Sequence, residues 1–111
     1  MLRTAYDLAG VEPNDISFIE MHGTGTKLGD PIEVESLQML LGASPWLTSA
    51  KAQFGHMEAA SGLLGVIRAV LCIQNQCLPK NPFLQELNPL LPSLKTPRES
   101  PIPLGLSLIH I

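Results

Sequence analysis

The 111-residue sequence is poor in charged and aromatic residues, at 15% and 5%, and carries a formal net charge of −3. It has no run of basic residues, so we expect neither nucleic acid nor an anionic membrane surface as a partner. The first residues show no long apolar stretch typical of a secretory signal. The most apolar run, residues 63–73, is too short to cross a bilayer and is interrupted by Arg68, which favours a buried helix. We expect a cytoplasmic protein, with a plastid as the open alternative.

The sequence also lacks a cysteine framework. Its two cysteines, Cys72 and Cys77, are five positions apart, which fits neither a zinc pair nor a disulfide scaffold. We interpret them as free thiols in a reducing compartment, with Cys72 packed inside a helix and Cys77 just beyond its end. No cysteine or serine stands where a catalytic nucleophile is expected.

The sequence does contain enough apolar residues, 45% of the total, for one domain with a hydrophobic core. Asp30, Pro31 and Glu33 together are typical of a helix start, with Asp30 as the cap and Glu33 completing a capping box. Gly10 and Gly42 are expected to end helices. In chain order the expected elements are a helix over 2–9, a strand over 16–21, a helix over 30–41, a strand over 46–50 and a helix from about 57 to about 76. Prolines dominate after residue 78 and predict a mostly extended segment.

Two histidines carry most of the functional information. His22 begins the segment 22–26 (HGTGT) and His56 ends the segment 51–56 (KAQFGH), and each segment follows a predicted strand. The order strand, helix, strand, helix predicts a parallel βαβ unit, in which both strands end at the same edge. Ligands of open α/β sheets bind at that edge, so we predict that both imidazoles share one pocket. There they would donate paired hydrogen bonds to a developing oxyanion.

Further polar residues stand near the two histidines. Lys51 is expected to be a buried ammonium that keeps the imidazoles neutral, and Glu58 is expected to pair with it at a helix start. Thr24 and Thr26 offer hydroxyl groups. All four residues also have a purely structural interpretation. Lys51 would then be a solvated surface lysine, Glu58 would only complement a helix dipole, and the two threonines would only satisfy loop hydrogen bonds.

A metal site formed by His22, His56 and Asp30 is a weaker hypothesis, because the spacing is not typical of metal ligands. We therefore predict no metal. His110, in the apolar C-terminal tail, is assigned no role.

Residues 18–33 and 49–62 resemble the two histidine-containing motifs of the β-ketoacyl synthases, especially the ketosynthases of polyketide synthases. Leu78-Pro79 and Asn88-Pro89 match the proline-bearing connection that follows in that family. The resemblance covers about residues 1–92 as a partial C-terminal ketosynthase-like domain and leaves 93–111 as an extended, unaligned tail. The two motifs in this order and at this spacing are much more specific than either one alone.

The resemblance implies an α/β fold, namely the βαβα unit of the C-terminal half of the thiolase-like fold. It implies decarboxylative Claisen condensation of acyl and malonyl-type thioesters in polyketide or fatty acid biosynthesis, with catalytic His22 and His56 and with Lys51 tuning them. Thr24 and Thr26 would contact the phosphopantetheine arm of a substrate carried by an acyl carrier protein. No cofactor is expected to bind directly, and the complete enzyme is expected to be a homodimer.

The sequence departs from the family pattern in three ways. The half that carries the nucleophilic cysteine has no counterpart here, and neither has the glycine-rich strand pair that normally closes the second half. Residues 50 and 52–54 also differ from the commoner choices around the lysine. We therefore expect a fragment that needs the N-terminal half, exposes apolar surface and is inactive alone. The alternatives are a non-catalytic thiolase-fold partner subunit or carrier-binding scaffold and, further behind, a thiolase-like enzyme acting on coenzyme A thioesters.

Overall fold

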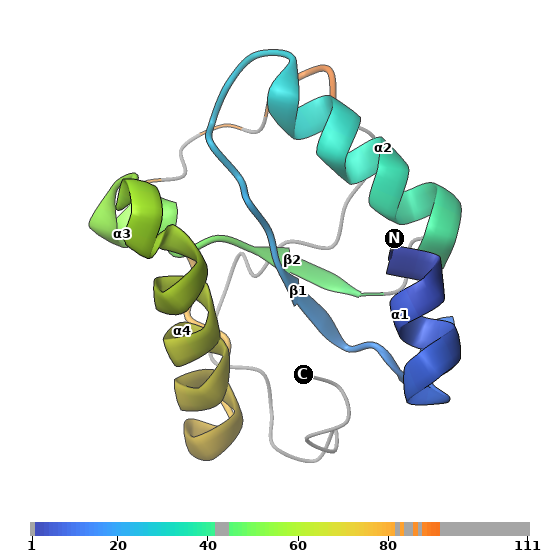
Figure 1. Cartoon of the computed structure of the whole chain (residues 1–111). Coiled ribbons are helices and arrows are strands. Elements are labelled where there is room, and N and C mark those ends of the chain that lie inside the picture. The colour runs from blue at the N-terminus through green and yellow to red at the C-terminus, as the bar shows by residue number, and fades with distance from the viewer. Residues whose placement is uncertain (1, 42–44, 82, 84–85, 87, 92–111) are drawn as a thin grey trace.

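The computed structural model describes residues 2–41, 45–81, 83, 86 and 88–91. Two short strands lie at the centre, with α1 and α2 on one side and α3 and α4 on the other (Figure 1). The elements are the α-helices α1 (Leu2–Ala9), α2 (Gly29–Leu41), α3 (Lys51–Phe54) and α4 (Ser61–Asn75), the strands β1 (Phe18–Glu20) and β2 (Trp46–Thr48), and the 3-10 turns η1 (Pro13–Asp15) and η2 (Glu58–Ala60). The predicted tail over 93–111 and the predicted helix end at Gly42 lie outside the described residues.

The two strands are parallel, and their register places Glu20 opposite Thr48. Backbone hydrogen bonds continue the pairing at both ends, from Trp46 N to Ser17 O at 2.8 Å and from Met21 N to Thr48 O at 2.7 Å. Because α2 connects the two strands, the predicted parallel βαβ unit is confirmed. Both strands therefore end at one edge.

The main hydrophobic core lies between α2 and the strands. The residues Val34, Leu37 and Leu41 recur at helical spacing and are buried together with Leu47 of β2. Partly buried apolar side chains surround this cluster: Tyr6, Ile16, Ile19, Met21, Leu40 and Leu91. Burial of this face of α2 fixes the helix relative to the sheet, and the loop after β1 is fixed with it.

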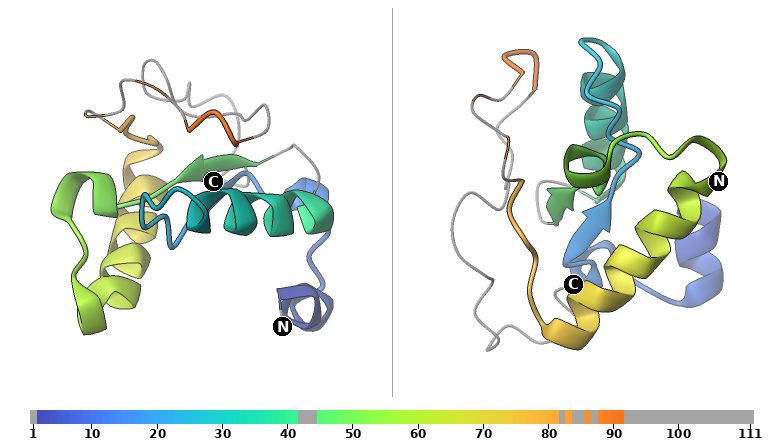
Figure 2. Two further views of the ribbon diagram at one scale, coloured as in Figure 1. Left: turned by 90° about the horizontal axis from the view of Figure 1, so that it is seen from above. Right: turned by 90° about the vertical axis from the view of Figure 1, so that its left-hand side faces the viewer.

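A second, smaller core forms where α4 meets the chain that follows it. Leu78 is fully buried beside Cys72, and Phe18 and Trp46 pack against them. The described part of the segment after α4 runs along the opposite side of the strands from α1 (Figure 2). This packing fixes the C-terminal end of α4.

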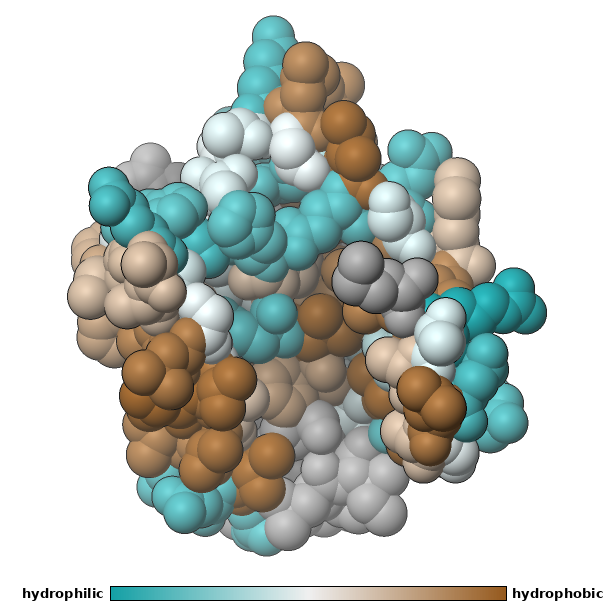
Figure 3. All heavy atoms as spheres, in the orientation of Figure 1, coloured by the Kyte–Doolittle hydropathy of each residue, from teal (hydrophilic) through white to brown (hydrophobic). Residues whose placement is uncertain are grey.

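Most of α4 is apolar and exposed, so the prediction of a buried helix over residues 63–73 is wrong for this chain, in which only Arg68 and Cys72 of α4 are buried. The exposed apolar surface that was expected of a fragment is found here instead. Figure 3 shows hydrophobic side chains gathered over this helix. Its exposed large apolar residues are Leu63, Val66, Ile67, Val70, Leu71 and Ile73. A patch of this kind is typical of a surface that another polypeptide covers.

The boundaries differ from the sequence prediction in three places. The strands are three residues each, shorter than the predicted 16–21 and 46–50. The predicted helix over 57–76 divides into η2 and α4, with Glu58 in the left-handed region at φ 47°. Lys51 begins the short helix α3 instead of ending β2.

In the part of the chain that the structure describes, no helix is both long and apolar enough to cross a membrane.

Candidate functional site

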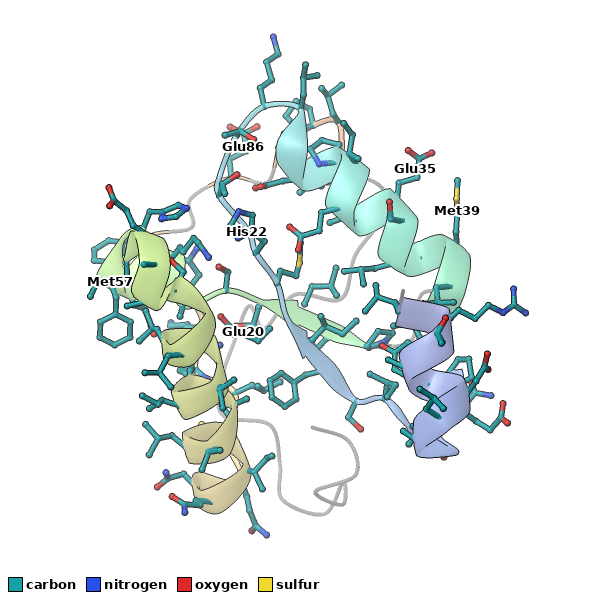
Figure 4. The ribbon with its side chains drawn as sticks, in the orientation of Figure 1. Glu20, His22, Glu35, Met39, Met57 and Glu86 are labelled. Carbon is teal, nitrogen blue, oxygen red and sulfur yellow. The ribbon has the colours of Figure 1, made fainter. Side chains whose placement is uncertain are left out.

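The two predicted histidines meet at the edge where both strands end. His22 follows β1 and His56 follows α3, and their ring centroids are 5.7 Å apart with the ring planes at 88°. Figure 4 shows His22 between the α3 side of the molecule and the N-terminal end of α2. The two imidazoles therefore lie next to each other, as the element order predicts.

The backbone at His22 is held by a carboxylate from α2. Glu33 accepts hydrogen bonds from the backbone N–H groups of His22 and Gly23, at 2.7 and 2.9 Å. Gly23 has φ +50°, and a Cβ atom there would lie 2.7 Å from the side chain of Ser49. This position therefore requires glycine for two reasons, backbone conformation and space.

The predicted capping box of Asp30 and Glu33 is wrong. Both carboxylates accept hydrogen bonds from backbone N–H groups of the loop after β1, and not from the first turn of α2. Asp30 is the second residue of α2 and accepts a hydrogen bond from Gly25 N at 3.0 Å, whereas Gly29 N, at the helix start, donates to Thr26 Oγ1 at 3.1 Å. Aspartate is a common cap, which is why the sequence favours Asp30, but its carboxylate is turned to the loop.

The hydroxyl groups of Thr24 and Thr26 lie 3.3 Å apart on the exposed side of this loop. Thr26 accepts a hydrogen bond from Gly29 N, as expected for a threonine that satisfies loop hydrogen bonds. The predicted contact of both residues with a phosphopantetheine arm stays a prediction. Asp30 faces the loop backbone, and the described residues contain no group of three or more side chains suited to a metal ion.

His56 is held by the backbone that follows it. The N–H of Glu58 donates to Nδ1 of His56 at 2.9 Å, and Ser61 Oγ lies 3.4 Å from the same nitrogen. When the ring is neutral, an acceptor Nδ1 places the proton on Nε2, which is then a hydrogen-bond donor. Glu58 thus acts through its main chain, and no ion pair joins its carboxylate to Lys51 among the described residues.

A cavity of about 310 Å³ opens beside His22 and reaches along α4. His22, Lys51 and Glu20 line it, together with the small residues Gly62 and Gly65, which leave space along the helix. His56 is absent from the described residues that line this cavity, so the cavity does not support the prediction that both imidazoles share one pocket. Lys51 is half-buried there, and its expected influence on the imidazoles stays a prediction.

The sequence reasoning missed one ion pair, which joins Glu20 of this cavity wall to Arg68, a residue that lines a second cavity. Glu20 and Arg68 form an ion pair at 2.5 Å, with side chains 12% and 7% exposed. The signal was present, because a glutamate in an apolar strand and an arginine in an apolar helix must find partners when they are buried.

The two cysteines lie elsewhere, at a second cavity of about 310 Å³ that Phe54 also lines. Both are free; Cys72 is buried in α4 and Cys77 is half-buried beyond its end, as predicted. Burial raises the pKa of the Cys72 thiol, although the nearby Arg68 charge acts in the opposite direction. A thiol of this kind is a poor nucleophile.

Comparison with known proteins places the chain in one family. Residues 1–85 match the model of the family described as the C-terminal domain of β-ketoacyl synthase. The chain is 40% identical over 104 residues to the non-reducing polyketide synthase mapC of Penicillium roqueforti, a match that covers 88% of this chain and 4% of the relative. It is 43% identical over 96 residues to the polyketide synthase ThaG of Burkholderia thailandensis, covering 79% of this chain and 2% of the relative.

Solved structures show the same similarity. The ketosynthase from module 6 of the bacillaene synthase of Bacillus subtilis superposes with a TM-score of 0.76 at 34% identity, over 82% of this chain and 18% of that one. The ishigamide ketosynthase/chain length factor superposes with a TM-score of 0.76 at 37% identity, over 82% of this chain and 23% of that one. The chain thus spans a small part of the proteins that it matches.

Proposed function

Because this chain belongs to the β-ketoacyl synthases, as part of their C-terminal domain, we propose that it supplies the histidine-bearing half of a polyketide ketosynthase site. The observation that supports this best is the 5.7 Å separation of the rings of His22 and His56, beside a cavity lined by His22 and Lys51. The reaction is the decarboxylative Claisen condensation of an acyl thioester with a malonyl-type thioester.

The chemistry asks for hydrogen-bond donors at one oxygen atom. Loss of carbon dioxide breaks the bond between the carboxylate carbon and the α-carbon, and the electron pair moves onto the thioester oxygen as an enolate. Preorganised N–H groups stabilise such an oxygen strongly. Nε2 of His56 is a donor in the tautomer that the Glu58 N–H selects, and His22 would provide the second donor.

The enolate then attacks the acyl thioester carbonyl. A new carbon–carbon bond forms, and the thiolate that held the acyl group leaves. Neither thiol of this chain suits that role, because Cys72 is buried with a raised pKa and Cys77 lies with it at the second cavity. The nucleophile would come from the N-terminal half of the domain, so we expect no condensation by this chain alone.

The remaining assignments follow from the same function. The substrate would arrive on the phosphopantetheine arm of an acyl carrier protein, with Thr24 and Thr26 contacting the arm. The exposed apolar face of α4 would be covered by other parts of a dimeric ketosynthase.

The test is malonyl-thioester decarboxylation by the complete ketosynthase domain that contains this chain. We expect His22→Ala and His56→Ala each to lower kcat by about 100-fold, by analogy with the loss of one oxyanion donor. His110→Ala, to which we assign no role, is the matched histidine control. Decarboxylation that is unchanged in both variants would favour a non-catalytic partner subunit or carrier-binding scaffold instead.

A further inference from the structure

Glu20 and Arg68 are oppositely charged residues, each within an otherwise mainly apolar element. Arg68 lies in the middle of α4, and Glu20 is the last residue of β1. Figure 4 shows Glu20 at the centre of the molecule, below His22. A buried ion pair contributes little net stability compared with two well-packed apolar side chains, so stability alone does not account for it.

The Glu20 carboxylate makes a second contact that an apolar side chain cannot make. Oε2 accepts from Arg68 Nη1, and Oε1 accepts from the backbone N–H of Ala50 at 2.5 Å. Ala50 is the residue before Lys51, and Glu20 stands two positions before His22. One carboxylate therefore joins the end of the strand that leads to His22 to the turn that carries Lys51.

The surroundings hold this carboxylate in one orientation. Arg68 is itself fixed, because Nη2 donates to the carbonyl of Pro79 at 3.3 Å. Gly65, one turn earlier on α4, leaves the necessary space, since a Cβ atom there would lie 3.3 Å from Cγ of Glu20. Among the described residues Arg68 Nε has no hydrogen-bond partner. The guanidinium is therefore positioned by its bonds to Glu20 and Pro79, although this leaves one of its own donors unpaired.

We propose that Glu20 is a positioning residue of the ketosynthase site: its carboxylate, oriented by Arg68, holds the Ala50–Lys51 turn at a set distance from His22. The inference rests on the proposed function, because it assigns Glu20 to the same cavity. The contribution of Glu20 is the acceptor oxygen for the Ala50 N–H, and its negative charge is secondary. This distinction makes the proposal testable.

The test compares two neutral pairs in the complete ketosynthase domain, Glu20→Gln/Arg68→Met and Glu20→Met/Arg68→Met. Both remove the two charges and have similar volume, but only glutamine keeps an oxygen that can accept from Ala50. We expect the glutamine pair to retain kcat for decarboxylation of malonyl-coenzyme A within about threefold of the parent. The methionine pair should lose at least about tenfold in kcat with little change in KM, because a small displacement of positioned groups is costly.

Equal kcat values for the two pairs would overturn the proposal. An inactive parent domain would instead contradict the proposed function, so the two failures are distinguishable. If a variant does not fold, the hydrogen bond from the Ala50 N–H to Glu20 can still be tested in the unsubstituted protein. Amide hydrogen exchange in the unsubstituted complete ketosynthase domain should show the Ala50 N–H protected, and exchange at the rate of an open backbone amide would also overturn the proposal.

Discussion

The two histidine loops of this chain are held by different kinds of contact. The loop at His22 depends on the side chains of α2, with Glu33 bonded to the backbone ten and eleven positions away in sequence. The loop at His56 depends on its own next turn, because the bonds to Nδ1 come from residues two and five positions later. The first histidine is therefore sensitive to how α2 packs, whereas the second is fixed by local backbone geometry.

The largest effect is expected at Gly23, where the first loop passes Ser49. Gly23→Ala places a Cβ atom 2.7 Å from Ser49 at a φ of +50°. The left-handed backbone and the overlap together should lower the free energy of unfolding by about 3 kcal/mol. Urea unfolding of the 111-residue chain measures this change.

Gly25→Ala is the matched control for that substitution. Gly25 also has a positive φ, +74°, but nothing lies within 4 Å of the added Cβ atom. Its cost should be limited to the backbone conformation, about 1 kcal/mol. The double variant Gly23→Ala/Ser49→Gly should recover part of the loss. Equal destabilisation by the two alanine variants would show that the contact with Ser49 does not constrain the first loop.

A smaller effect is expected from removal of the carboxylate that holds His22. Glu33→Ala leaves two backbone N–H groups without their acceptor, and we expect a loss of about 2 kcal/mol. Glu33→Gln keeps one acceptor oxygen and should lose about half as much. Thermal or urea unfolding measures the stability, and the NMR cross-peak between the rings of His22 and His56 reports on the position of the first ring.

Glu35→Ala provides the control for this helix, because Glu35 is exposed on α2 and points away from the loop (Figure 4). It should leave both the stability and the inter-ring cross-peak unchanged. Loss of the cross-peak in Glu35→Ala as well would mean that α2 as a whole, and not the Glu33 carboxylate, sets the position of His22.

The same difference between the loops explains what could be predicted from the sequence. The parallel βαβ unit and the meeting of His22 with His56 follow from element order, because chain connectivity alone brings the two strand ends together. The roles of Asp30 and Glu33 did not follow, since a carboxylate at a helix start fits a cap as well as it fits a neighbouring loop.

Long-range pairs were the other part that sequence reasoning missed. In the sequence, Arg68 indicates only an interruption of an apolar run, and Glu20 only one residue of a predicted strand. Their partnership depends on which face of α4 meets β1, which is decided by tertiary packing around Leu78 and Cys72. Periodicity indicates that a helix exists but does not specify its rotation about its own axis.

The smallest effect is expected at the loop of His56. It tests most directly whether this loop is held by its own backbone, whereas the loop of His22 is held by side chains of α2. Ser61→Ala removes only the longer of the two contacts to Nδ1 of His56, at 3.4 Å, and leaves the bond from Glu58 N at 2.9 Å. We expect a change of less than about 0.5 kcal/mol in unfolding free energy, as for an exposed polar substitution. The ¹⁵N shifts of the imidazole should still report a proton on Nε2, because the backbone donor alone selects that tautomer. A shift of the proton to Nδ1 in Ser61→Ala would mean that the hydroxyl holds the ring, and the second loop would then depend on side chains as the first one does.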